Sequence, residues 1–125
     1  MGAERALDRA LEEKLRIVQE LVPGKQITIA HIIANPSKAL AEKLSLPSGG
    51  NHGAIGIVTM SPAEAAIIAA DIALKAAGVA LGVVDTATGT LIFTGSVSEV
   101  EAALKDIMAF AGGKMDFSVC EITRT

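Results

Sequence analysis

The sequence is poor in aromatic residues and in cysteine. It contains no tryptophan and no tyrosine, and its three phenylalanines are Phe93, Phe110 and Phe117. Few rings are therefore available on which nucleic-acid bases or sugars could stack. One cysteine, Cys120, excludes a disulfide framework and a cysteine-based zinc site. The formal net charge of −3 gives none of the basic surface that nucleic-acid binding requires, so we expect no nucleic-acid partner.

A membrane-spanning segment and a secretory signal are also absent from the pattern. The longest apolar stretch, residues 65–84, contains Asp71 and Lys75, and each would cost about 2.5–3.5 kcal/mol at a bilayer centre. Residues 1–14 alternate acids and bases and have no apolar h-region. We therefore expect no membrane association, and the single cysteine is typical of the reducing cytosol.

The sequence lacks the residue patterns of common catalytic and cofactor sites. Residues 22–26 have neither the first glycine nor the hydroxyl residue of a phosphate loop. The glycines at 49–53 precede a strand, whereas those of a dinucleotide fingerprint follow one. His31 and His52 have no acidic or cysteine partners at metal-ligand spacing; we interpret His31 as a core or interface residue and His52 as exposed. We expect no catalytic residue, no metal and no cofactor, so the chain is not predicted to be an enzyme.

Apolar side chains make up half of the 125 residues, and many of them are small. Alanine occurs 22 times, while leucine, isoleucine and valine together occur 33 times. The length predicts one domain, and a domain of this size cannot bury so much apolar surface by itself. We therefore expect association with other subunits.

Hydrophobic periodicity and turn residues predict an α+β domain. From residue 54 onward the order is β-α-β-β-α-β, which is the ferredoxin-like pattern. Residues 61–64 and 96–99 both match the capping box that begins a helix, and Gly78 and Gly112–Gly113 are expected to end these helices. The expected strands are 26–34, 54–60, 79–85, 90–94 and 117–123, and the expected helices are 35–44, 62–77 and 97–113. We expect residues 1–25 to be a charged, partly helical leader and residues 26–125 to be the domain.

The helix at 62–77 has an unusual distribution of charge. Its charged residues are Glu64, Asp71 and Lys75, which fall within about 40° of one another on a helical wheel. The rest of the circumference is alanine, isoleucine or leucine. Such a helix is predicted to be covered by another subunit, and a lightly exposed alanine-rich face is the alternative.

Several separated motifs carry a resemblance to a known family. They are RIVQELVPGKQITIAHIIA at 16–34, GAIGI at 53–57, DIALKAA at 71–77, GSVSEV at 95–100 and CEITR at 120–124. In this order they resemble the circularly permuted bacterial-microcompartment (BMC) shell proteins of ethanolamine and propanediol utilisation, with related forms in choline systems. The resemblance covers about residues 15–125. It implies a BMC domain in which the usual last strand and helix lead the chain.

The same resemblance implies a structural function and a set of partners. The family forms flat cyclic hexamers that tile into a shell around pathway enzymes in the bacterial cytoplasm. The expected partners are copies of this chain, other shell proteins and, through the leader, an encapsulated enzyme. The alternative is an oligomeric small-molecule-binding regulator or enzyme subunit, because ferredoxin-like folds host many functions.

Residue roles are implied position by position. Lys75 matches a lysine at the hexamer edge, although it could instead keep its helix soluble. Arg124 matches an edge arginine, with a frayed terminal residue as the alternative, and Gly53 matches a glycine at which some members bend. The hairpin is the expected pore loop, and residues 15–20 are the expected pore-capping strand, although the leader's leucine spacing favours a helix. The pore loop would consist of Thr86, Ala87, Thr88 and Gly89. The capping strand would consist of Leu15, Arg16, Ile17, Val18, Gln19 and Glu20.

Overall fold

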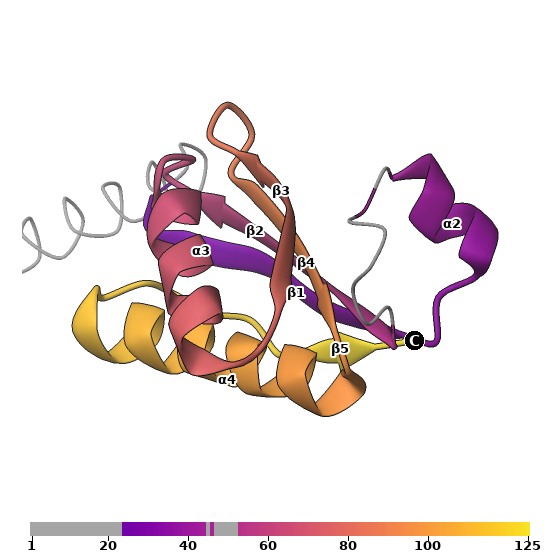
Figure 1. Cartoon of the computed structure of the whole chain (residues 1–125). Coiled ribbons are helices and arrows are strands. Elements are labelled where there is room, and N and C mark those ends of the chain that lie inside the picture. The colour runs from indigo at the N-terminus through magenta and orange to yellow at the C-terminus, as the bar shows by residue number, and fades with distance from the viewer. Residues whose placement is uncertain (1–23, 45, 47–52) are drawn as a thin grey trace, which may run out of the picture.

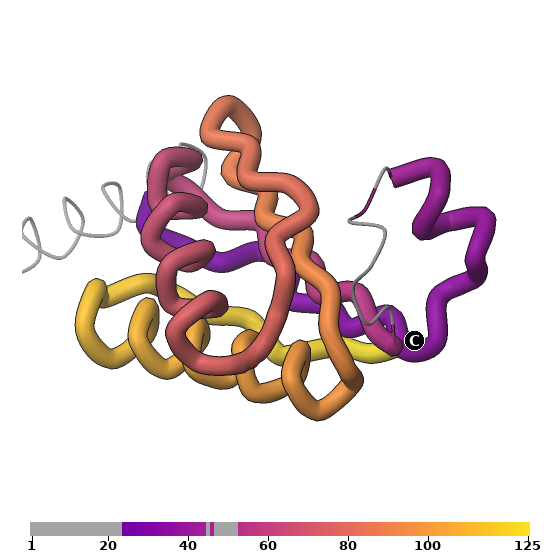
Figure 2. Tube along the Cα trace, viewed as in Figure 1, coloured from indigo at the N-terminus to yellow at the C-terminus, as the bar shows by residue number. Residues whose placement is uncertain are grey.

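The fold is one five-stranded sheet with two helices packed on the same face (Figures 1 and 2). It is seen in a computed structural model, which describes residues 24–44, 46 and 53–125. The sheet order is β3-β4-β2-β1-β5. The elements are β1 (Gln26–Ala34), α2 (Lys38–Lys43), β2 (Ala54–Ser61), α3 (Ala65–Ala76), β3 (Ala80–Asp85), β4 (Thr90–Gly95), α4 (Val97–Lys114) and β5 (Thr123–Arg124).

Strand pairing places the first strand of the domain inside the sheet. β1 is antiparallel to β2 and parallel to β5, where His31 lies opposite Thr123. β2 and β3 each pair antiparallel with β4. From β2 onward the elements follow the predicted β-α-β-β-α-β order, which confirms the α+β class.

The core lies between the sheet and helices α3 and α4. Its largest fully buried side chains include Phe93 and Leu91 of β4 and Leu104 and Ile107 of α4. Gly56 of β2 is needed for this packing, since a Cβ built there would lie 2.6 Å from Phe93 Cε2. The sheet and α4 therefore approach closely around the phenylalanine ring.

Of the two predicted capping boxes, the second is confirmed and the first is wrong. At α4, Glu99 N–H donates to Ser96 Oγ at 3.1 Å and Ser96 N–H donates to Glu99 Oε1 at 2.9 Å. The bond from the Ser96 backbone, followed by that from its side chain, lowers the pKa of Glu99. At α3, by contrast, Ser61 remains in β2 opposite Gln26, and the helix begins at Ala65 with no side-chain cap. Strand pairing therefore outweighed the local capping pattern.

Other boundaries also differ from the sequence predictions. α2 begins after Ser37, whose Oγ accepts from Leu40 N–H at 3.2 Å, and not at residues 35–36. α3 ends before Ala77, which is extended, and does not reach Gly78.

At the carboxyl end, α4 continues through the predicted stop at Gly112–Gly113 as far as Lys114, because the bond from Phe117 N–H to the Ala111 carbonyl holds its end. The strand expected at 117–123 is reduced to β5 and an isolated bridge between Gln26 and Ser118. Residues 1–23 of the leader lie outside the described residues.

Candidate assembly surfaces

Helix α3 places small side chains inside and large apolar side chains outside. Its buried residues are all alanines: Ala65, Ala66, Ala69, Ala70 and Ala73. Its exposed residues include Ile67 at 57%, Leu74 at 50% and Ile68 at 41% of full exposure. These large side chains are thus available to a partner, as the sequence predicted for this helix.

Lys75 lies on this exposed face, next to Asp71. Its Nζ is 2.8 Å from Asp71 Oδ2, one helical turn away, and both side chains are largely in solvent. An exposed pair of this kind contributes little to folding, about 0.3–0.5 kcal/mol. The lysine is therefore available for contacts outside its own chain.

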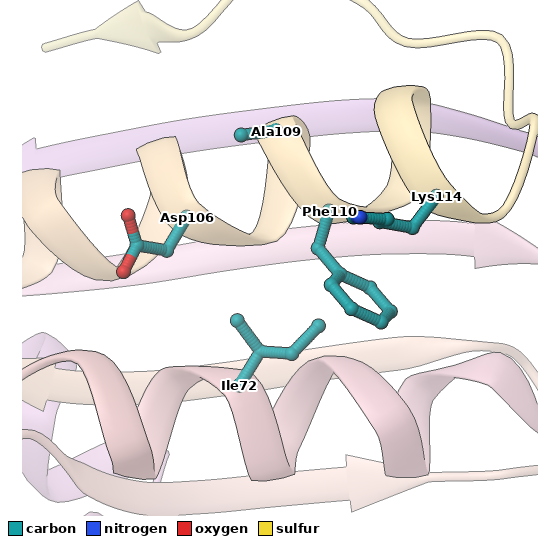
Figure 3. A pocket seen from close by; sticks show the side chains of 5 residues that line it. All are labelled: Ile72, Asp106, Ala109, Phe110 and Lys114. Carbon is teal, nitrogen blue, oxygen red and sulfur yellow. The ribbon is translucent and has the colours of Figure 1, made fainter.

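A shallow groove of about 370 Å³ runs between α3 and α4. Its apolar part is formed by Ile68, Ile72 and Phe110, and Asp106 and Lys75 stand at its border. Figure 3 shows Ile72 and Phe110 pointing toward each other from the two helices. Sequence patterns did not predict this groove, although Phe110 follows the buried Ile107 by three residues and so falls at the edge of the predicted apolar stripe.

Arg124 is held on the edge strand β5. Thr125 N–H donates to the Ile32 carbonyl at 2.9 Å, and the His31 ring nitrogens lie 2.6 Å from Thr123 Oγ1 and 2.9 Å from Thr125 Oγ1. The His31 ring is therefore partly buried and satisfied, as expected for a core or interface histidine.

Each edge candidate has its own acidic neighbour. The pKa of Glu101 is lowered first by the hydrogen bond from Lys105 and its charge, and in smaller part by the charge of Arg124. Arg124 thus acts on Glu101 through its charge only, whereas Lys75 forms a direct ion pair with Asp71. An i,i+4 search of the sequence would have found the Glu101–Lys105 pair, whose atoms are 3.0 Å apart.

The hairpin between β3 and β4 projects beyond the rest of the domain (Figure 1). Asp85 Oδ1 accepts from Ala87 N–H at 2.8 Å and from Thr88 N–H at 3.3 Å. Gly89 has φ +75° and lies against the Met60 carbonyl, so a side chain at this position would clash with the end of β2. The predicted hairpin is therefore confirmed. Its turn is held by the hydrogen bonds to Asp85, and the side chains of Thr86 and Thr88 are exposed.

The remaining predicted residues lie apart from these surfaces. Gly53 immediately precedes β2, and its carbonyl accepts from Asn35 N–H at 2.8 Å. The capping-strand candidate at 15–20 lies outside the described residues. Within the described part of the chain, no group of three or more His, Cys, Asp or Glu side chains could hold a metal ion, and no helix is long and apolar enough to cross a bilayer.

Three known proteins to which this chain is similar carry the same description, bacterial microcompartment shell protein. The family model described as "BMC domain" matches residues 54–123, from the start of β2 into β5. The microcompartment shell protein PduU of Salmonella typhimurium is 52% identical over 88% of this chain and 93% of its own length. EutS of Escherichia coli K12 is 47% identical over 90% and 99%. CutR of Streptococcus intermedius is 46% identical over 88% and 92%.

Solved structures agree with these relatives. The flat hexamer of CutR, form 1, superimposes with a TM-score of 0.77 at 44% identity, covering 83% of this chain and 94% of that one. A CutR screw assembly with a 41.9 Å pitch gives a TM-score of 0.75 at 44% identity, covering 82% and 100%. The same fold is therefore found in both flat and helical assemblies.

Proposed function

This chain belongs to the BMC domain family, and from that premise we propose that it is a structural shell protein of a bacterial microcompartment. In this proposal it forms cyclic hexamers that tile, with other shell proteins, around pathway enzymes in the bacterial cytoplasm. The observation that carries the proposal is the match to shell proteins over nearly their whole length, 93% of PduU and 99% of EutS. The apolar outer face of α3 supports it, because exposed apolar patches are typical of surfaces that contact another protein.

We propose that the hexamer edge includes Lys75 and Arg124. Both are exposed charges with weak intrachain partners, so contact with a neighbouring hexamer would displace little existing structure. Ile68 and Leu74 flank Lys75 and would add apolar area to the same contact. Each contact is small, but a hexamer makes six of them, and this multiplicity would hold a sheet together.

The hairpin is proposed to line the central opening. It projects from one end of the sheet, while α4 begins at the opposite end, after Gly95. β1 also begins at the hairpin end, since Gln26 pairs with Ser61. Residues 15–20 precede β1 by only five residues, so a strand formed by them would end near this side of the sheet, which supports the proposed capping role.

The position of β1 supports circular permutation. The family match begins at β2, yet the sheet contains a strand between β2 and β5 that comes from earlier in the chain. We propose that β1 and α2 are the strand and helix that end the chain in ordinary family members. A bend at Gly53 and the binding of an enclosed enzyme by the leader stay predictions.

Two measurements on the full chain test the shell function. Native mass spectrometry is expected to give a hexamer, and negative-stain electron microscopy at rising protein concentration is expected to give flat sheets or tubes. A trimer that binds a small molecule saturably would instead favour an oligomeric regulator. A monomer at millimolar concentration would contradict both proposals.

A further inference from the structure

The hairpin region carries a single charged side chain. Between residues 78 and 98 the one ionisable residue is Asp85, at the end of β3 where the turn begins. Thr86, Ala87 and Thr88, which form the projecting tip, are exposed and uncharged. The electrostatic character of any opening lined by this hairpin is therefore set by Asp85.

The turn keeps this carboxylate ionised and in place. Asp85 Oδ1 accepts backbone hydrogen bonds from Ala87 and Thr88, at 2.8 Å and 3.3 Å. These bonds, the one from Ala87 first, hold the pKa of Asp85 below its ordinary value. Thr88 Oγ1 in turn donates to Thr90 Oγ1 at 3.0 Å, which fixes the far side of the turn.

No described cation stands close enough to cancel this charge. Across Gly89 the nearest atoms belong to Met60 and Ala63, which are both uncharged, and Glu64, the residue after Ala63, is another acid. Lys25 lies at the same end of the sheet but precedes β1, which is three strands from β3, roughly 14 Å at the usual strand spacing. That separation exceeds a Debye length of about 8 Å at physiological salt. The leader residues 15–20 carry one arginine and one glutamate, so their net charge is zero.

We propose that the Asp85 carboxylates of the six subunits form an anionic ring at the central opening, which favours cationic and neutral small molecules over anionic ones. This inference rests on the proposed function, because the ring exists only in the hexamer. Rings of carboxylates select cations in other pores by the same physics. The turn amides hold the six charges in equivalent positions, so their fields add along the axis.

Charged thiol reagents test the ring in the full chain. Cys120→Ser removes the native thiol, and Thr86→Cys places a new one on the exposed tip. The rates of modification by a cationic trimethylammonium thiosulfonate and an anionic sulfonate thiosulfonate are then compared on the hexamer. The control is Ala109→Cys, an exposed site on α4 whose charged neighbours Lys105, Asp106 and Lys114 are of both signs, so no excess of acid surrounds it.

The ring predicts a cation-to-anion rate ratio at Thr86→Cys that exceeds the control ratio by roughly tenfold and falls in high salt. Asp85→Asn keeps the carbonyl oxygen that accepts from the two amides, so the turn should survive while the ratio collapses toward the control value. Equal ratios at the two sites, or a ratio unaffected by Asp85→Asn, would overturn the ring. Failure of both reagents at position 86 would also overturn it, since the hairpin would then be sealed. Native mass spectrometry of each variant shows whether the hexamer still forms, so loss of the ring can be distinguished from loss of the hexamer.

Discussion

Lys75→Ala should separate folding of the chain from assembly of the sheet. The ion pair it removes, Lys75 Nζ to Asp71 Oδ2 at 2.8 Å, is largely exposed. Such pairs are worth about 0.3–0.5 kcal/mol, and alanine is a slightly better helix former than lysine. We therefore expect the free energy of unfolding to change by less than about 0.5 kcal/mol.

The effect on the sheet should be larger because it is multiplied. A hexamer in a sheet has six edges, each shared with a neighbour, so it owns about three contacts. If the lysine contributes about 0.5 kcal/mol to each contact, its removal costs about 1.5 kcal/mol per hexamer. This corresponds to a roughly tenfold higher critical concentration for sheet formation.

A sedimentation assay over a protein concentration series measures this critical concentration directly. Electron microscopy identifies the pelleted material, and native mass spectrometry shows that the variant is still hexameric. Lys105→Ala is the matched control, since it removes the other i,i+4 ion pair, Lys105–Glu101, on α4. An unchanged critical concentration for Lys75→Ala, or an equal rise for the control, would refute the assigned edge role.

Three further substitutions test the fold itself. Gly56→Val should destabilise the domain by about 1–3 kcal/mol in chemical denaturation, because even a Cβ there lies 2.6 Å from Phe93 Cε2. Glu99→Gln should flatten the acid limb of the stability profile: the pKa of Glu99 is lowered on folding, so its contribution is present above the ordinary glutamate range and is lost as the pH falls below it. His31→Ala should speed amide hydrogen exchange in β5, whose threonine hydroxyls then lose the imidazole, with no comparable change in α3.

Periodicity predicted most elements correctly because their local and tertiary preferences agree. β1 was predicted at its observed bounds, 26–34, from a segment rich in β-branched residues. The capping box at Ser96 was correct because both of its hydrogen bonds can form without disturbing β4, which ends at Gly95. The helical wheel alone predicted that the charged residues of α3 lie together on one side of the helix.

The errors occurred where a tertiary contact outweighs a local signal. Ser61 has the sequence of a helix cap, but its pairing with Gln26 extends β2 by one residue. Gly112 and Gly113 have the sequence of a helix stop, yet α4 continues to Lys114, at a cost of about 1 kcal/mol per glycine. The groove beside Phe110 depends on the distance between two helices, which no window of sequence contains.

The packing of α3 shows why its exposed face is evidence for a partner. The face toward the sheet is built from five buried alanines, and this brings the helix close to a core already filled by Phe93 and Leu91. Close approach explains the small residues inside, but it places no demand on the outside. Lysine, glutamate or glutamine would suit exposed helical positions as well as isoleucine and leucine do, and would improve solubility. Ile67 and Leu74, each at least half exposed, therefore have no role in folding that a polar residue could not fill. Their burial against a second subunit is the physical reason for an apolar surface at this position.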